Sequence, residues 1–216
     1  MKKLFTIIAL VAISLFVFTA CEKQGEEAGK HKGHEYVDLG LPSGLKWATC
    51  NVGATTPEEY GDYFAWGEVE PKTTYNLDTY KYYDGSNFTK YTGRDKTVLD
   101  PEDDAVTANW GGAWRMPTNA EQNELRTKCK WDWTTQNGVN GYKVTGPNGN
   151  LIFLPAAGYM DEGTLYGAGL KGYYWSSSLG TVDPFSAYYD GGVDSDYVDR
   201  LIYSRDIGLS VRPVCQ

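Results

Sequence analysis

Alternation of apolar and polar residues early in the polar part of the chain predicts a β-hairpin. Residues 35–39 and residues 45–49 each alternate with a period of two, and residues 40–44 between them contain two Gly, a Pro and a Ser. A period of two places alternate side chains on opposite faces of a strand, and Gly and Pro are typical of turns. We therefore expect two antiparallel strands here, joined by a tight turn.

The clearest helix signal begins at residue 118. Thr118 is followed three residues later by Glu121, which is the capping-box pattern in which each side chain accepts a hydrogen bond from the other residue's backbone N–H. This pattern predicts a helix from about Asn119 to Cys129, with Leu125 facing the core.

Further strands are predicted in the second half of the chain. Residues 141–145 and 150–155 flank the turn sequence Gly-Pro-Asn-Gly, and residues 173–177 and 209–214 have the apolar and aromatic character of strands. Residues 69–104 lack sustained periodicity, which predicts long loops. Together these patterns predict an α+β fold with one main helix, short antiparallel strands and long loops.

The N-terminus has the pattern of a lipoprotein signal peptide over residues 1–20. Lys2 and Lys3 precede an apolar run from residue 4 to residue 18, which is short for a membrane span and suits a signal h-region. Small residues then precede Cys21, as in a lipidation site, with ordinary signal cleavage as the alternative. We expect a lipid anchor at the outer membrane or cell surface, with the periplasmic face as the alternative.

The segment that follows is predicted to be a tether. Residues 21–34 are polar and charged and have no apolar period, so we expect a flexible tether that precedes a single domain at residues 35–216. The two histidines of the chain, His31 and His34, lie in or at the edge of this segment, and we expect them to be solvated. The formal net charge of −8 argues against nucleic acid as a partner, because nucleic-acid binding requires clustered positive charge.

Residues for catalysis are sparse. With both histidines near the tether, Ser-His and Cys-His pairs have little support, so we expect no catalytic residue and no cofactor. Cys50, Cys129 and Cys215 allow one disulfide with one thiol left over, and their pairing stays open. Carboxylates are plentiful, and two of them could sit at glycosidase spacing by chance, which leaves a carbohydrate-active enzyme as a distant alternative.

Two groups of acidic residues could supply oxygen ligands for a metal ion. These groups are Asp100, Asp103 and Asp104, and Asp194, Asp196 and Asp199. We interpret both as solvated surface carboxylates and expect no metal site.

Residues 180–207 have the composition of a recognition surface. The segment is rich in Tyr, Asp, Ser and Gly and contains no His, Cys, Lys or Trp. Tyr provides a large, stiff contact area, whereas Ser, Gly and Asp provide adaptable polar groups. The predicted ligand contacts are Tyr188, Tyr189, Asp190, Asp194, Asp196, Tyr197, Asp199, Arg200, Tyr203, Arg205 and Asp206. Because side chains alternate along a strand, we expect some of them to face inward.

Seven blocks of sequence resemble the Fibrobacter succinogenes major paralogous domain family. They are residues 36–48 (YVDLGLPSGLKWA), 51–54 (NVGA), 61–68 (GDYFAWGE), 114–118 (WRMPT), 153–159 (FLPAAGY), 174–177 (YWSS) and 208–214 (GLSVRPV). The resemblance implies a fold similar to C-type lectins and to the formylglycine-generating enzyme, with paired N- and C-terminal strands and a loop-rich half that carries the ligand face. It also implies that the protein is a lipoprotein, since many members of the family are. Most members have no assigned biochemical activity. The four tryptophans within these blocks are expected in the core: Trp47, Trp66, Trp114 and Trp175.

A second resemblance concerns residues 173–207. Target proteins of diversity-generating retroelements often have a C-type-lectin-like domain with a C-terminal variable region, in which Asn codons become Tyr, Asp, Ser or Gly codons. The composition of residues 173–207 is similar to such a region, and an ordinary polar and aromatic loop is the alternative.

These observations favour a binding protein. We expect a protein or glycan ligand on another cell, a phage or a host surface, contacted by the C-terminal segment. The alternative is a structural or adhesive surface protein, such as an adhesin or a pilus-like component, without a diversified site. An enzyme similar to the formylglycine-generating enzyme ranks third, because no matched pair of active-site cysteines is present.

Overall fold

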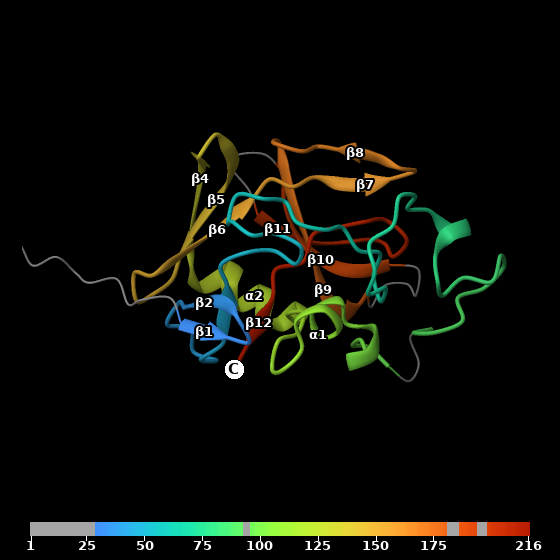
Figure 1. The fold of residues 1–216 in the computed structure, drawn as a ribbon, viewed down its shortest axis with the longest axis horizontal. Coiled ribbons are helices and arrows are strands. Elements are labelled where there is room, and N and C mark those ends of the chain that lie inside the picture. The colour runs from blue at the N-terminus through green and yellow to red at the C-terminus, as the bar shows by residue number, and fades with distance from the viewer. Residues whose placement is uncertain (1–28, 93–95, 181–185, 194–197) are drawn as a thin grey trace, which may run out of the picture.

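The computed structural model describes residues 29–92, 96–180, 186–193 and 198–216 (Figure 1). It consists mostly of antiparallel strands in small sheets with few helices, which is the α+β class that the sequence predicts. Predictions for the signal peptide and Cys21 lie outside these residues. No helix in the described ranges has the length and apolar character needed to cross a membrane.

The two ends of the domain meet in one four-stranded sheet of order β1-β2-β3-β12. Its strands are β1 (Gly29–His31), β2 (His34–Asp38), β3 (Lys46–Ala48) and β12 (Val214–Cys215). The predicted hairpin is confirmed as β2 and β3, and Val214 of β12 pairs with Trp47 of β3. Figure 1 shows β12 and the C-terminus beside β1 and β2. The predicted tether is wrong at its end, because residues 29–31 and 34 already form strands.

Both histidines take part in this fold, so the interpretation of them as solvated residues is wrong. The His34 ring stacks on Trp110 with centroids 3.6 Å apart, and His31 Nε2 accepts a hydrogen bond from the Ala113 N–H. These contacts fix the N-terminal strands against the loops around residue 112.

The central sheet contains the segment that we predicted as a recognition surface. Its order is β11-β10-β9, and its strands are β9 (Lys171–Leu179), β10 (Ser186–Val193) and β11 (Val198–Ser204). Ala187 of β10 lies opposite Leu179 of β9, and both are buried. Adjacent β9 residues enter different apolar clusters, since Trp175 belongs to one and Tyr174 to the other. The central sheet therefore separates two cores.

Two smaller sheets complete the fold. The first has the order β4-β5-β6, and its strands are β4 (Lys130–Gln136), β5 (Val139–Thr145) and β6 (Leu151–Pro155). The second is the hairpin of β7 (Tyr159–Asp161) and β8 (Thr164–Tyr166). The predicted pair β5 and β6 is confirmed, whereas β4 was not predicted.

The main helix is as predicted. The helical elements are α1 (Ala105–Trp110), α2 (Asn119–Lys128) and the 3-10 turns η1 (Leu77–Thr79) and η2 (Pro101–Asp103). At the start of α2, Thr118 and Glu121 form the capping box, and Leu125 is buried. The four tryptophans expected in the core are all at most 2% exposed, and Cys50, Cys129 and Cys215 are free thiols.

A buried arginine near the C-terminus joins three separate segments. The Arg212 side chain donates from Nε to Asn51 Oδ1 at 2.8 Å and from its terminal nitrogens to the carbonyl oxygens of Thr49 at 2.7 Å and Phe153 at 3.0 Å. A third carbonyl, that of Ala48, accepts at 3.0 Å. Buried carbonyl groups require a donor, and a planar guanidinium supplies several in fixed directions. Arg212 therefore holds β3, the following loop and β6 together.

We expect Arg212→Lys to lower the free energy of unfolding by about 3 kcal/mol, because an ammonium cannot reach acceptors on opposite sides and leaves buried carbonyls unpaired. The control is Arg126→Lys, at a half-buried arginine whose nearest acid, Asp199, is 3.9 Å away. Urea unfolding measures both variants. Equal, small effects of the two substitutions would contradict the role of Arg212.

Candidate functional site

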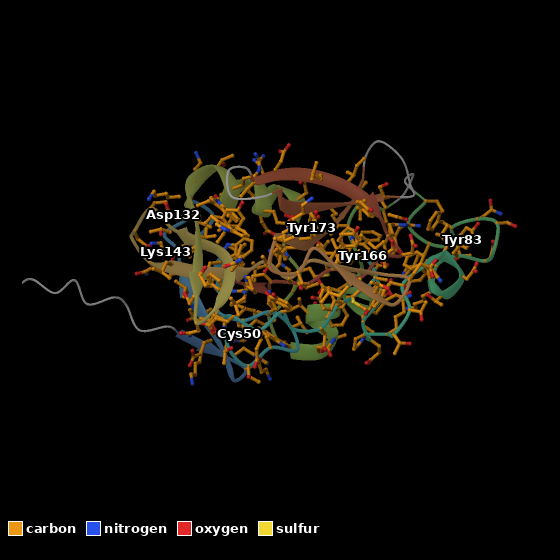
Figure 2. The ribbon with its side chains drawn as sticks, turned by 90° about the horizontal axis from the view of Figure 1, so that it is seen from above. Cys50, Tyr83, Asp132, Lys143, Tyr166 and Tyr173 are labelled. Atoms are coloured by element: carbon orange, nitrogen blue, oxygen red, sulfur yellow. The ribbon has the colours of Figure 1, made fainter. Side chains whose placement is uncertain are left out.

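A pocket of about 370 Å³ opens between the β7–β8 hairpin, the loop before β9 and the end of β11. Tyrosine dominates its wall, so we call it the tyrosine pocket. Its described lining residues are Tyr159, Tyr166, Gly167, Leu170, Lys171, Tyr173, Tyr203, Ile207 and Leu209. Figure 2 shows Tyr166 and Tyr173 near the middle of one face of the molecule, away from Tyr83 at one end.

The ring of Tyr159 lies at the centre of the pocket's aromatic wall and contacts the rings of the other three tyrosines. Its ring centroid is 5.5 Å from that of Tyr166 in a stacked arrangement, and 5.6 Å from that of Tyr173 in an edge-to-face arrangement. The Tyr203 ring is tilted against it at 6.0 Å. Aromatic pairs at these separations stabilise one another. The four rings therefore form a preformed wall rather than independent side chains.

The hairpin that carries Tyr159 and Tyr166 is fixed by its backbone. Tyr159 and Tyr166 are direct cross-strand partners, and Met160 exchanges two backbone hydrogen bonds with Gly208. Gly158, just before the hairpin, has a φ of 68°, and a Cβ there would lie 2.1 Å from the Tyr166 carbonyl oxygen. A side chain at residue 158 would thus push β8 away and open the aromatic wall.

The hydroxyl groups of Tyr159 and Tyr173 are neutral at physiological pH. Burial raises the pKa of Tyr159, and the adjacent Tyr203 and Asp161 raise it further. Burial also raises the pKa of Tyr173, to which Tyr159 and Tyr203 contribute. The positive charge on the wall comes from Lys171, which forms no ion pair with the side chains that the structure describes. The pocket thus offers aromatic faces, neutral hydroxyls and one ammonium group.

The structure brings one predicted contact, Tyr203, into this pocket, where its side chain is 41% exposed. Asp199 is half-buried and lies 3.9 Å from Arg126. Four more predicted contacts lie on β10 and β11 with only their backbone described: Tyr188, Tyr189, Asp190 and Arg200. The predictions for Asp194, Asp196 and Tyr197 lie outside the described residues.

Two predicted contacts are wrong, because Arg205 and Asp206 are buried. The chain turns inward directly after β11, so that the Arg205 guanidinium lies 3.9 Å from the Phe88 ring centroid and donates to the Tyr91 carbonyl. Asp206 accepts a hydrogen bond from the Ser204 hydroxyl. Both side chains hold the turn in place and are not available to a ligand.

Sequence reasoning missed most of the pocket. Tyr159, Tyr166, Lys171 and Tyr173 come from segments far from Tyr203 in sequence. Tyr159 ends one of the seven family-like blocks and Tyr173 begins the predicted strand at 173–177, so sequence features already drew attention to both residues. No sequence feature indicated Tyr166 or Lys171, because their role depends on how the hairpin folds over the central sheet.

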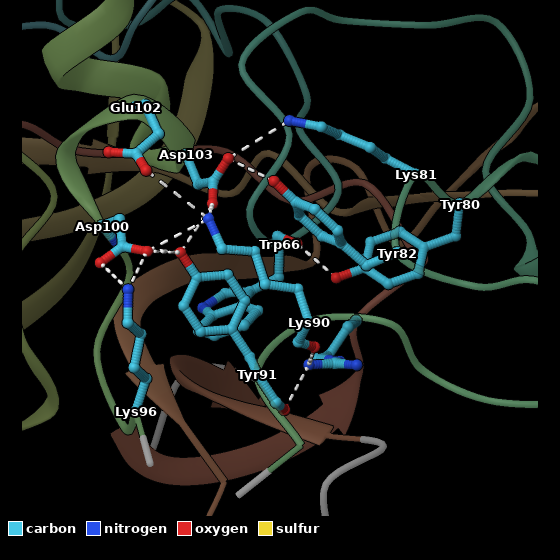
Figure 3. A network of polar contacts seen from close by, with 11 residues as sticks. Trp66, Tyr80, Lys81, Tyr82, Lys90, Tyr91, Lys96, Asp100, Glu102 and Asp103 are labelled. Carbon is cyan, nitrogen blue, oxygen red and sulfur yellow. Dashed lines mark hydrogen bonds and ion pairs between the residues drawn. The ribbon is translucent and has the colours of Figure 1, made fainter.

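An acidic cluster that includes Asp100 and Asp103, two of the residues considered above as metal ligands, surrounds a lysine. The carboxylates of Asp100, Glu102 and Asp103 lie within 4.8 Å of one another. Figure 3 shows the Lys90 ammonium between them, 3.1 Å from Asp100 and 3.7 Å from Glu102, with a third ion pair to Asp103. This ammonium occupies the space between the three carboxylates.

Asp103 and Asp104 are buried, so the interpretation of them as solvated carboxylates is wrong. Asp104 caps α1 by accepting from the backbone N–H groups of Val106 and Thr107. Asp103 accepts from the hydroxyls of Tyr82 and Tyr91 in addition to its ion pairs, as Figure 3 shows. These bonds attach the long loops to the core.

A second pocket, of about 360 Å³, lies beside the N-terminal strands. His34, Trp110 and Cys50 line it, and burial lowers the pKa of His34. The Cys50 Sγ lies 3.6 Å from the Thr49 hydroxyl, and the His34 ring is stacked on Trp110. We favour the tyrosine pocket as the functional site, because the predicted recognition segment contributes Tyr203 to it.

No protein-family model, curated protein or solved structure matches this chain. The resemblance to a known family therefore stays a prediction that is based on the seven sequence blocks.

The Asp103 network makes stability depend on acid pH. Burial alone would raise the pKa of Asp103, but hydrogen bonds from Lys90, Tyr82, Tyr91 and Lys81 outweigh it and lower the pKa from 3.8 to about 2. A carboxylate with a lowered pKa in the folded state stabilises that state above its unfolded pKa, and this contribution is lost as the pH falls towards the folded pKa. We expect the free-energy difference between wild type and Asp103→Asn, measured by urea unfolding, to shrink between about pH 4 and pH 2. A difference that stays constant over this range would contradict the assignment.

Proposed function

We propose that the protein is an exported, lipid-anchored binding protein whose tyrosine pocket and adjoining C-terminal segment recognise a macromolecular or cell-surface ligand. One observation carries the proposal: Tyr203, from the predicted recognition segment, joins Tyr159, Tyr166 and Tyr173 around an open pocket of about 370 Å³. This volume falls in the usual range for ligand sites, roughly 300–1,000 Å³.

The chemistry of the lining residues supports binding rather than catalysis. Among the described residues that line the pocket, the titratable groups are four tyrosines and Lys171. A tyrosine with a raised pKa is a poor general base at neutral pH, and the lining offers it no described carboxylate or imidazole partner. Aromatic faces and hydroxyls provide contact area and orientation, which is what a binding site requires.

The surface around the pocket extends this contact area. The exposed apolar side chains of Leu165, Tyr166, Leu170 and Tyr203 are between 41% and 66% exposed. Tyr166, Leu170 and Tyr203 also line the pocket, so the exposed surface continues into it. Continuous exposed apolar surface is a feature of interaction sites.

The proposed fold within the α+β class is C-type-lectin-like, as in the Fibrobacter succinogenes major paralogous domain family. It is supported by the pairing of β12 with β3, which brings the two ends of the domain together. The loops that follow β3 and the β7–β8 hairpin would then belong to the ligand-bearing half.

Diversification by a retroelement is part of the proposal for residues 173–207. That range contains Tyr173 and Tyr203, so substitutions there would change two walls of the pocket. It also contains the buried residues Leu179, Ala187 and Arg205. Because substitution of close-packed side chains destabilises a fold, these three positions would have to stay constant.

A structural or adhesive surface protein is the second candidate function. The observation that favours it is the position of Leu165, Tyr166 and Leu170, which are exposed and lie outside residues 180–207. A partner subunit that covers these residues would bury them without any diversified contact.

An array of purified bacterial and host surface glycans and surface proteins, probed with the full-length protein, tests the proposal. We expect Tyr203→Ala and Leu170→Ala to weaken binding to any hit at least tenfold, because both side chains form the pocket wall. The matched controls are Tyr83→Ala and Leu151→Ala, a half-buried tyrosine and a 45% exposed leucine that do not line it.

Unchanged binding by both pocket variants, or equal loss in the controls, would overturn the proposal. Self-association of the wild type in sedimentation, lost in Leu170→Ala, with no array hit would instead favour the structural role.

A further inference from the structure

We propose that the tyrosine pocket binds an acidic sugar, with the sugar ring on the tyrosine faces and its carboxylate on Lys171. This inference rests on the proposed function and names the chemical class of its ligand. A hexuronate unit of a surface polysaccharide or a terminal sialic acid would have this chemistry.

Lys171 is the first reason. Several other lysines in the described part of the chain are paired with carboxylates, as Lys72 is with Glu68 and Lys96 with Asp100. Lys171 is half-buried, lines the pocket and has no such partner in the regions that the structure describes. An anionic ligand group in the pocket would complement the positive charge of the Lys171 ammonium.

The position of Lys171 is fixed. Its backbone N–H donates to the Gly167 carbonyl at 2.9 Å, and its carbonyl accepts from the Gly158 N–H at 2.8 Å. The stem of its side chain packs over Gly167, where an added Cβ would lie 3.8 Å from the Lys171 Cβ. The ammonium is therefore attached to the same backbone framework as the aromatic wall, and it would need little reorganisation to meet a carboxylate.

The tyrosine wall is the second reason. A pyranose ring has an apolar face of C–H groups and a rim of hydroxyls, so it matches aromatic faces whose edges carry hydroxyl groups. Tyr159 and Tyr166 supply stacked faces, Ile207 and Leu209 supply apolar floor, and the hydroxyls of Tyr159 and Tyr173 stay protonated. A purely apolar ligand would bury the Lys171 ammonium without supplying a compensating charge, which is unfavourable.

Other ligand classes fit the pocket less well. A quaternary ammonium suits an aromatic cage, but the Lys171 charge would repel it. A phosphate ion has no apolar face that could pack against the four tyrosine rings. The volume of about 370 Å³ lies near the lower end of the usual range for ligand sites and suits a mono- or disaccharide unit.

Calorimetry with the full-length protein tests this inference. The probes are trigalacturonate and sialyllactose, each compared with its methyl ester, which keeps the ring and removes the charge. We expect at least one acid to bind about tenfold tighter than its ester at low salt, and Lys171→Gln to remove this preference. Lys143→Gln is the control, because Lys143 is also half-buried but lies on β5 away from the pocket (Figure 2).

The outcomes separate this inference from the proposed function. If both acids bind no tighter than their esters, or if Lys171→Gln keeps the preference, the acidic-sugar assignment is wrong, while pocket-dependent hits on the array would leave the proposed function intact. Loss of the preference in Lys143→Gln as well would show a general charge effect and would also overturn the assignment. If Tyr203→Ala fails to weaken any binding, both the proposed function and the acidic-sugar assignment are wrong.

Discussion

The buried guanidinium of Arg212 is the interaction on which the rest of the structure depends. It satisfies carbonyl oxygens at the end of β3, in the loop that follows and in β6, and the Arg212 side chain itself is 1% exposed. Phe153 of β6 is 105 residues from Ala48 of β3 along the chain (153 − 48), so no local preference could hold β6 against β3 and its following loop. The rigid guanidinium supplies the hydrogen-bond donors that these buried backbone carbonyl groups require.

The position of Arg212 also determines the position of the tyrosine pocket. The segment that leads to it passes Gly208, which pairs with Met160, and Leu209, which pairs with Phe64. Ser210 then accepts a hydrogen bond from the backbone N–H of Trp175. These contacts place β11 and the turn after it against the β7–β8 hairpin. The pocket wall is therefore a consequence of how the C-terminal segment is attached to the core.

Short sequence patterns correctly predicted the elements that depend on interactions between neighbouring residues. The hairpin of β2 and β3, the turn between β5 and β6 and the capping box at Thr118 all depend on a few neighbouring residues, and all three are confirmed. The strand around Trp131 was missed, because its pairing with Val144 is decided by a distant partner.

Charged residues were hardest to interpret from the sequence. Arg205 and Asp103 have side chains that are solvated in most proteins, yet each is buried here by contacts with residues from other segments. Phe88 and the Tyr91 carbonyl hold Arg205, and Lys90 lies against Asp103. Composition indicated a recognition segment at residues 180–207. Only the fold shows that β10 and β11 of this segment join the central sheet and that its described side chains Tyr203 and Ile207 line the pocket.

Hydrogen–deuterium exchange on the full-length protein, with and without the acidic oligosaccharide that binds most tightly, tests the central claim most directly. The account predicts slower exchange of backbone amides in residues 159–173 and 203–209, which form the tyrosine pocket. Slower exchange confined to residues 33–55 and 110, which line the second pocket, or no change at residues 159–173 and 203–209, would contradict it.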